Sequence, residues 1–297
     1  MVQVSIDAAK VPQELSEQTP GYWASVGRRF LRDKVAVGAA LVVLVLVMLA
    51  LIGQWLAPAD PYASSMLSRL KPLGTPGHPL GTDELGRDML SRLLTGARLS
   101  LFMGITPVLC AFVIGSCLGI LAGYAGGAIN STIMRTIDVF YAFPSVLLAI
   151  ALSGALGAGI FNALLSLTIV FVPPIARVAE SVTTQVRGRD FVEAARASGA
   201  NAFTIVRVHV LGNVLGPIFV YSTSLIAVSM ILASGLSFLG LGVKPPEPEW
   251  GLMLNTLRTA IYTQPWIAAL PGVMIFITSI SFNMLSDGLR SAMDVKQ

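Results

Sequence analysis

Long apolar runs separated by short polar segments dominate the pattern along this chain. Residues 35–56 (VAVGAALVVLVLVMLALIGQWL) form an uninterrupted run of 22 residues without a charge. A helix needs about 20 apolar residues to cross the hydrocarbon core of a bilayer. Similar runs predict further spans over residues 99–124, 137–156, 161–181, 214–239 and 266–285. The pattern predicts an all-α membrane protein with six transmembrane helices.

The composition agrees with this fold class. Hydrophobic residues make up 54% of the chain and charged residues only 12%, whereas a soluble domain carries about 25% charged residues. The net charge of +4 does not indicate nucleic-acid binding, because the basic residues flank apolar runs. Cys110 and Cys117 lie inside one such run, so neither a disulfide nor a metal site is expected. The first apolar run begins only at residue 35 and is too long for a signal peptide.

The basic residues also predict the orientation in the membrane. Six spans place residues 1–34, the 124–136 and 182–212 loops and the C-terminal tail on one side. This side carries 13 Lys and Arg residues, if Arg177 is counted with the 182–212 loop, against 7 in the loops on the other side. Positive charge is enriched on the cytoplasmic side of membrane proteins. Both termini are therefore predicted to be cytoplasmic.

The first external loop contains HPLGTDELGRDMLSRLLTGARLSL. Thr82 or Asp83 can cap a helix here, and apolar side chains then fall on one face. The apolar positions are Leu85, Met89, Leu90, Leu93 and Leu94, and the opposite face holds Arg87, Asp88, Ser91 and Arg92. This pattern predicts an amphipathic helix over residues 82–94 that lies in the membrane interface. Contact with a substrate or partner is the alternative.

Charges and prolines within the spans are candidates for function. Asp138 follows Arg135 by three residues, so an ion pair on one helix face near the membrane interface is expected. An ionisable residue within a span is otherwise a functional candidate. Pro144, Pro173 and Pro174 each remove a helix hydrogen bond and are expected to kink their spans.

The segment SFLGLGVKPPEPEWGLMLN follows the fifth apolar run. Gly240 and Gly242 are expected to end the helix, and the prolines that begin at Pro245 favour an extended loop. Trp250 and Trp266 are typical of the external membrane interface, where an amphipathic ring is favourable.

A polar segment, DFVEAARASGAN, interrupts the apolar pattern at residues 190–201. It predicts a short cytoplasmic helix that Asp190 caps, that Glu193 stabilises through the helix dipole and that Gly199 ends. The small residues of this helix are Ala194, Ala195, Ala197 and Ser198. Such a surface lets another backbone approach closely and suits docking into a groove. An ordinary interfacial loop helix is the alternative.

Catalytic and nucleotide-binding signatures are absent from the sequence. There is no phosphate-binding G-x-x-x-x-G-K-[ST] loop and no HExxH or GxSxG motif, and the two histidines, His78 and His209, lie in different loops. The chain is therefore not expected to be an enzyme or to bind a metal or other cofactor. An ion-coupled secondary transporter, the distant alternative, should show inverted repeats or midplane charges.

The EAARASGA stretch resembles the EAA signature of permease subunits of binding-protein-dependent ABC importers. Glu193, Ala194, Ala195 and Gly199 match its E-A-A-x-x-x-G part. The family's later I-x-L-P is replaced by a sequence that ends in Gly212 rather than proline. In that family the motif is the coupling helix, which a cleft on the ATPase subunit receives.

Four further motifs resemble the second permease of the dipeptide, oligopeptide and nickel importers. They are HPLGTDELGRDMLSRLLTGARLSL, MRTIDVFYAFPSVLLAIAL, SFLGLGVKPPEPEWGLMLN and FNMLSDGLR, in the family's order. They cover the chain from about residue 57 to 290. Family-motif positions without an assigned role are Asp83, Gly86, Arg87, Asp88, Asp138, Pro144, Pro245, Trp250 and Gly251.

The resemblance implies a type I importer permease fold and half of a translocation pathway in a bacterial inner membrane. The implied partners are a homologous second permease, two ABC ATPases that use ATP and Mg, and an extracytoplasmic solute-binding protein. Dipeptides or oligopeptides are the default solutes, and nickel, glutathione or another peptide-like solute is the alternative. The implied organisation is a tail (1–34), a first helix (35–56), an external loop (57–98), a transmembrane domain (99–290) with a coupling loop (182–212), and a tail (291–297).

Overall fold

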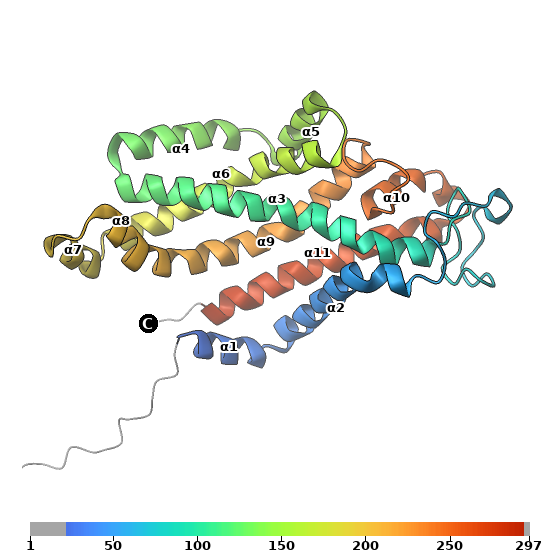
Figure 1. The fold of residues 1–297 in the computed structure, drawn as a ribbon, viewed down its shortest axis with the longest axis horizontal. Helices are drawn as coiled ribbons and strands as arrows, with labels where there is room; N and C mark the ends of the chain where they lie inside the picture. Colours follow the sequence, from blue (N-terminus) through green and yellow to red (C-terminus); the bar gives the residue numbers. More distant parts are fainter. Residues whose placement is uncertain (1–21, 294–297) are drawn as a thin grey trace, which may run out of the picture.

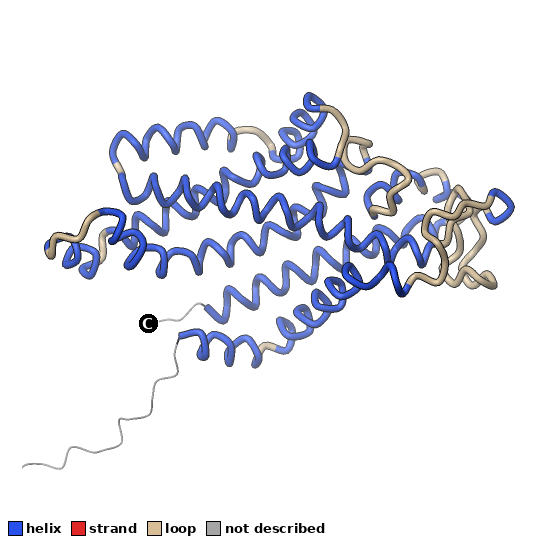
Figure 2. Tube along the Cα trace, in the orientation of Figure 1, coloured by secondary structure: helices blue, strands red, loops and turns tan. Residues whose placement is uncertain are grey.

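The computed structural model describes residues 22–293, so most of the first predicted tail and the last four residues lie outside it. The described chain is helical (Figures 1 and 2). Its α-helices are α1 (Tyr22–Arg32), α2 (Lys34–Leu56), α3 (Met89–Ala125), α4 (Gly127–Tyr141), α5 (Ser145–Leu156), α6 (Ile160–Arg187), α7 (Asp190–Ala197), α8 (Ala202–Ile205), α9 (Leu211–Phe238), α10 (Trp250–Thr256) and α11 (Pro265–Met293). A π-helical turn, η3 (Val206–Val210), joins α8 to α9, and short 3-10 turns lie at Met66–Ser68 and Ala260–Tyr262.

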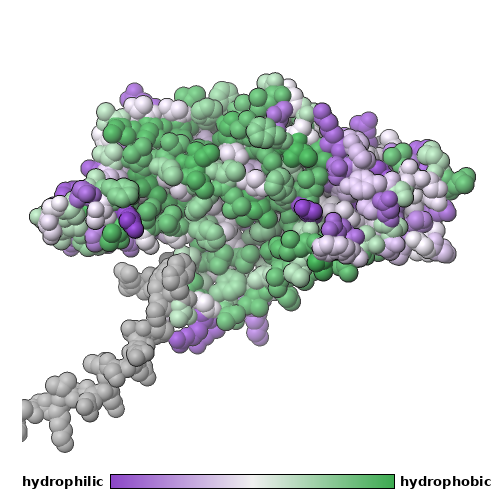
Figure 3. All heavy atoms as spheres, in the orientation of Figure 1, coloured by the Kyte–Doolittle hydropathy of each residue, from purple (hydrophilic) through white to green (hydrophobic). Residues whose placement is uncertain are grey.

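The predicted membrane fold is confirmed. Among the described residues, five helical stretches are long and apolar enough to cross a bilayer: α2, α3, α6, the continuous stretch Ala202–Phe238, and α11. The pair α4 and α5 adds a sixth span if its two bent helices are taken together. In Figure 3 hydrophobic residues cover the middle of the molecule and polar residues gather at its ends, as a membrane-spanning orientation of the long axis requires.

The third span differs from the prediction. Residues 137–156 do not form one helix, because α4 ends at Tyr141 and α5 begins at Ser145 with a bend of 87° between them. Pro144 lies at the break as the residue before α5, where its ring is incompatible with a continuing helix. The predicted 124–136 loop is also wrong, since only Gly126 separates α3 from α4. The polar residues of α4 lower its hydropathy and hide it from the sequence pattern.

The centre of the bundle is α3, which packs most extensively on α6 and also contacts α9 and α2. Three glycines spaced four residues apart in the second half of α3 permit this close approach. A Cβ atom at Gly115 would lie 3.0 Å from the Ile175 Cβ, and one at Gly123 would lie 2.7 Å from the Glu180 carbonyl oxygen. A Cβ at Gly119 between them would overlap the backbone of α6. The two helices are therefore packed backbone against backbone.

The two ends of the long axis differ in structure (Figures 1 and 2). We call one the α7 end, which carries α7 and α8, and the other the α10 end, which carries α10, the 57–88 loop and the 239–249 segment. The charge distribution predicts that the α7 end is cytoplasmic. Most of the non-helical chain lies at the α10 end.

The positions of two arginines correct the charge count. Arg177 lies inside α6, ten residues before the helix ends at Arg187, and Arg135 lies inside α4 rather than in a loop. The sixth span also continues past residue 285, because α11 ends only at Met293. Without Arg135 and Arg177, the predicted cytoplasmic side still carries more Lys and Arg residues than the other side.

Candidate functional site

The polar segment at the α7 end folds as α7, an eight-residue helix anchored by one side chain. Val192 is fully buried against the rest of the bundle, whereas Glu193 and Ala194 are exposed. The predicted cap is wrong, because Arg189 is the residue before the helix and Asp190 is the first helical residue. Asp190 and Glu193 both lie in the first turn, where a negative charge is favourable.

Gly199 ends this helix as the sequence predicts. It has a φ of +82°, which is strained for any residue with a Cβ. Its N–H bonds to the Arg196 carbonyl oxygen at 3.0 Å, and the Ala200 N–H bonds to that of Ala195 at 3.1 Å. These two bonds form a Schellman motif. The exposed surface of α7 thus combines an acidic residue, small side chains and a tight turn.

A short non-helical segment, residues 198–201, connects α7 to the next helix. Asn201 caps α8 by accepting a 2.8 Å hydrogen bond from the Thr204 N–H. The π-helical turn η3 then leads directly into α9, so Ala202–Phe238 is one continuous helical stretch. Gly212 lies within α9, in the place of the family's proline. The chain is therefore helical from Ala202 into the bundle, and only residues 198–201 separate this stretch from α7.

The α10 end does not contain the predicted interfacial helix. Residues 82–88 form a turn, and residues 89–94 are the first turns of α3. Asp88, not Thr82 or Asp83, caps that helix, accepting from the Ser91 N–H at 2.8 Å. The polar face expected in water is instead buried, because its partners come from the 57–88 loop and the 239–249 segment.

A buried ion cluster replaces that face. The Asp83 carboxylate accepts from the Arg87 Nε at 2.7 Å and from the Arg87 backbone N–H at 2.9 Å. The Arg92 Nε lies 3.3 Å from the same carboxylate. Asp83 and Arg92 are each 2% exposed, and Arg87 is 5% exposed. Gly86 supplies the positive φ of +73° at the turn between them.

This cluster joins the 57–88 loop to the 239–249 segment. The Arg92 guanidinium donates to the Pro61 carbonyl oxygen at 2.9 Å and to the Pro246 carbonyl oxygen at 3.4 Å. On its other side, Asp88 contacts the His78 Nδ1 at 3.0 Å. Pro245 belongs to the extended segment, as predicted, and its bond to Pro246 is cis. The structure thus brings Asp83, Gly86, Arg87, Asp88 and Pro245 to one end of the molecule.

Trp250 and Gly251 lie in the same region but not at a membrane interface. Trp250 is fully buried, so its predicted interfacial position is wrong, whereas Trp266 is exposed. Glu249 caps α10 by accepting from the Gly251 and Leu252 N–H groups, each at 2.8 Å. Its burial raises the pKa of the Glu249 carboxyl above its usual 4.5.

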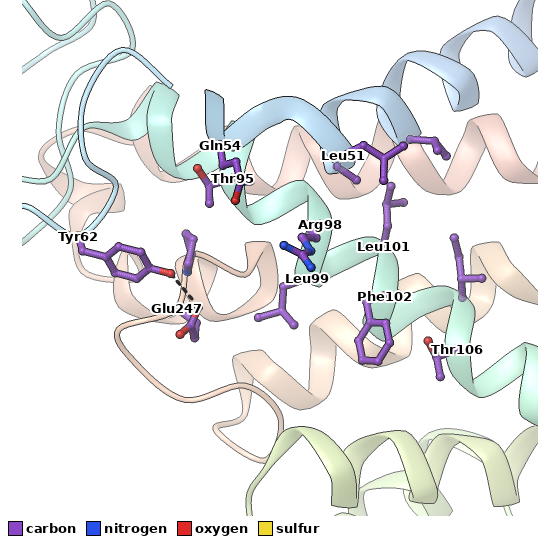
Figure 4. A pocket seen from close by; sticks show the side chains of 14 residues that line it. Leu51, Gln54, Tyr62, Thr95, Arg98, Leu99, Leu101, Phe102, Thr106 and Glu247 are labelled. Carbon is purple, nitrogen blue, oxygen red and sulfur yellow. Dashed lines mark hydrogen bonds between the residues drawn. The ribbon is translucent and has the colours of Figure 1, made fainter. Parts of the chain in front are cut away.

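A cavity of about 680 Å³ opens beside this cap, between α2 and α3. Figure 4 shows Gln54 and Thr95 at one side, and Tyr62 hydrogen-bonded to Glu247 at the end. The Tyr62 hydroxyl donates to the Glu247 carboxylate at 3.0 Å. Burial and this hydrogen bond raise the pKa of Tyr62. Arg98 lies among the apolar lining residues of α3.

A third polar site lies between the two ends. Asp138 pairs with Arg177 of α6, so the predicted pair with Arg135 is wrong. The Arg177 Cζ lies 4.9 Å from the centroid of the Tyr141 ring. Sequence reasoning missed Arg177, because 39 residues separate it from Asp138 and the charge count assigned it to a loop. No cluster of residues able to hold a metal ion occurs among residues 22–293.

The sequence matches known families over most of its length. Residues 115–296 match the binding-protein-dependent transport system inner membrane component family. Residues 21–72 match the N-terminal transmembrane domain of oligopeptide transport permease C.

Curated relatives are similar over nearly the whole chain. The glutathione transport system permease protein GsiD of Pectobacterium atrosepticum is 43% identical over 286 residues, which is 96% of this chain and 94% of that protein. GsiD of Escherichia coli O157:H7 is 40% identical over 294 residues, 99% of this chain and 96% of that protein.

Solved structures support the fold. A subunit of the inward-facing MetNI methionine ABC transporter aligns with a TM-score of 0.57 at 20% identity, over 69% of this chain and 97% of that one. A chain of an amino acid ABC transporter aligns with a TM-score of 0.51 at 15% identity, over 66% of this chain and 91% of that one. The chain belongs to the inner membrane components of binding-protein-dependent ABC importers, as a multi-pass permease subunit that is not itself an enzyme.

Proposed function

We propose that this permease forms half of the pathway for glutathione or a closely similar peptide. The observation that carries the proposal is the 40–43% identity to glutathione permeases over nearly the full length. Their names favour glutathione, which the sequence analysis gave as an alternative, over dipeptides or oligopeptides. The proposed partners are a homologous second permease, two ATPases that hydrolyse ATP with Mg, and an extracytoplasmic binding protein.

We also propose that α7 is the contact with an ATPase subunit. Glu193, Ala194 and Gly199 are exposed while Val192 holds the helix on the bundle. Small exposed residues allow a partner groove to approach the α7 backbone closely. The helical connection through η3 to α9 gives a route by which ATP-driven movement reaches the membrane.

Uptake by the reconstituted complex tests the solute. The complete complex is placed in liposomes with the binding protein outside and ATP inside, and labelled glutathione is compared with a labelled dipeptide. Glutathione uptake that depends on both ATP and the binding protein is expected. Dipeptide uptake without glutathione uptake would return the assignment to the dipeptide and oligopeptide class.

Substitutions in α7 and at the glycine that follows it test the coupling contact. Glu193→Lys and Gly199→Asp are expected to reduce co-purification of the ATPases and to lower solute-stimulated ATP hydrolysis at least tenfold. Asp60→Lys, a reversal at an exposed carboxylate of the α10 end, is the control and should leave co-purification unchanged. Normal assembly and coupling in both α7 variants would show that the ATPase docks elsewhere.

A further inference from the structure

The Asp138–Arg177 pair lies within two membrane-spanning helical segments, away from the ends of α4 and α6 that face the α7 end. With a helix rise of 1.5 Å per residue, Asp138 is about 16 Å from the start of α4 and Arg177 about 15 Å from the end of α6. Both helix termini lie toward the α7 end (Figure 1). The two side chains are therefore at a similar depth. They are also accessible, with 55% of the Asp138 side chain and 48% of the Arg177 side chain exposed.

Exposed charges within a membrane-spanning segment require a polar environment. Charged groups facing acyl chains are costly, and in membrane proteins they face the bundle interior or a water-filled cavity. The contrast with Asp83 and Arg92 is direct, because that ion pair is buried within the protein. The surface bearing Asp138 and Arg177 therefore faces an aqueous path or the partner permease, not lipid.

A cavity of about 340 Å³ adjoins the pair, between the α4–α5 break, α6 and α9. Its lining residues include Tyr141, Phe143, Ser145, Pro174 and Tyr221. Tyr141 connects the cavity to the ion pair, because it lines the cavity and the Arg177 guanidinium lies over its ring. Pro174 is one helical turn from Arg177. The volume falls within the ~300–1,000 Å³ of small-molecule sites.

We propose that the pair and this cavity form a solute-contact site on the translocation pathway, which receives the α-amino-acid end of a peptide-like solute. Arg177 binds the α-carboxylate, Asp138 binds the α-ammonium group, and the aromatic cavity takes the remainder of the solute. This inference rests on the proposed function, because glutathione carries such a zwitterionic end on its glutamyl residue.

The chemistry of the pair suits transient binding. A guanidinium group forms two parallel hydrogen bonds to a carboxylate. When a zwitterion enters, each protein charge exchanges its internal partner for a solute partner, so neither charge is left unpaired. Competition from the internal pair keeps the affinity low. A weak site releases the solute rather than trapping it.

Selectivity for the ammonium group is the first test. Uptake of glutathione and of N-acetylglutathione is measured with the complete complex, for the wild type and for Asp138→Asn. The same binding protein serves both measurements, so its own preference cancels when the two ratios are compared. The preference for free glutathione is expected to fall about tenfold in Asp138→Asn, as loss of one charge-assisted hydrogen bond implies. A lower uptake of both solutes at an unchanged ratio would assign the pair to the fold alone.

Arg177 provides a conservative series. Arg177→Lys is expected to retain a larger part of the uptake than Arg177→Gln. Lysine keeps the positive charge and loses only the ability to form two parallel hydrogen bonds to a carboxylate. Co-purification of the second permease confirms that each variant is folded. Equal uptake by both variants and the wild type would overturn the role of Arg177.

A measurement of water access tests the cavity without depending on which solute is transported. Ser145→Cys is placed in a Cys110→Ala, Cys117→Ala background and exposed to a membrane-impermeant thiol reagent during ATP turnover. Val113→Cys, on the exposed face of α3, is the matched control and is about 18 Å from the end of its helix. Labelling at position 145 but not 113 is expected. No labelling at 145 would overturn the site even if glutathione is transported, whereas labelling without glutathione uptake would reject only that solute.

Discussion

The Trp250 indole Nε1 donates a hydrogen bond of 3.1 Å to the Leu93 carbonyl oxygen, which joins the first residue of α10 to the second turn of α3. The Trp250 backbone N–H donates to the Ser100 hydroxyl at 3.0 Å on the same helix. Because Trp250 is fully buried, these bonds are shielded from water. The α10 end is therefore held to α3 by specific polar contacts as well as by packing.

Truncating Trp250 should loosen this junction. Trp250→Ala is expected to lower the free energy of unfolding by about 3–5 kcal/mol, as for other buried aromatic residues. Trp250→Phe loses the hydrogen bond and part of the buried ring volume, and should cost less than Trp250→Ala, about 1–3 kcal/mol. Thermal unfolding of the detergent-solubilised protein measures both. Trp266→Ala, at an exposed tryptophan, is the control, and an equal loss there would contradict the assignment.

Close packing at Gly96 predicts a second effect. A Cβ atom at this position would overlap the Pro248 carbonyl oxygen, so Gly96→Ala should destabilise the protein by about 1–3 kcal/mol. Gly235→Ala has nothing within 4 Å of the added Cβ and should be neutral or stabilising by up to about 1 kcal/mol. The unfolding temperature should therefore fall for Gly96→Ala and should not fall for Gly235→Ala. Similar shifts would show that α3 and the 239–249 segment separate easily.

Removing the charge of Asp83 should be severe. Asp83→Asn leaves Arg87 and Arg92 buried near each other without their carboxylate. Breaking a buried ion pair in this way costs about 3–5 kcal/mol. The yield of folded protein and its resistance to protease report the loss. Asp60→Asn, at an exposed residue of the same loop, should change neither measurement.

The raised pKa of Glu249 predicts a pH dependence of stability. A folded protein in which this pKa is raised binds the proton more tightly than the unfolded chain does. The resulting stability is present below the ordinary pKa of 4.5 and is lost as the pH rises through the raised pKa. Between these values the unfolding temperature of the wild type should fall relative to that of Glu249→Gln. If the unfolding temperatures of the two proteins changed with pH in the same way, the burial of the Glu249 carboxyl would be contradicted.

Hydropathy predicted the long helices because their apolar runs are continuous. It does not indicate which partners the polar side chains contact. The pattern of Arg87, Asp88 and Arg92 is the same whether these side chains face water or a buried partner. Only the folded loop supplies Asp83 and the carbonyl oxygens that bury them. Pro144 marked the third span as irregular, yet a kink and a bend of 87° give the same residue pattern.

The candidate sites show the same limit. Gly199 was predictable because local backbone geometry requires a glycine there, and the structure gives it a φ of +82°. The partner of Asp138 was not predictable, because Arg177 is distant in sequence and nearby Arg135 satisfies the helical spacing equally well. Contacts between helices depend on how they are rotated about their axes, which a single sequence does not specify.

The glycines of α3 restrict how this permease can change shape. A one-residue slide between α3 and α6 would press side chains of α6 into backbone atoms of α3 at Gly115, Gly119 and Gly123. We therefore expect α3 and α6 to move together as one rigid unit. Movement is then left to the surfaces around that unit, which include the largely exposed α2 and the bend between α4 and α5.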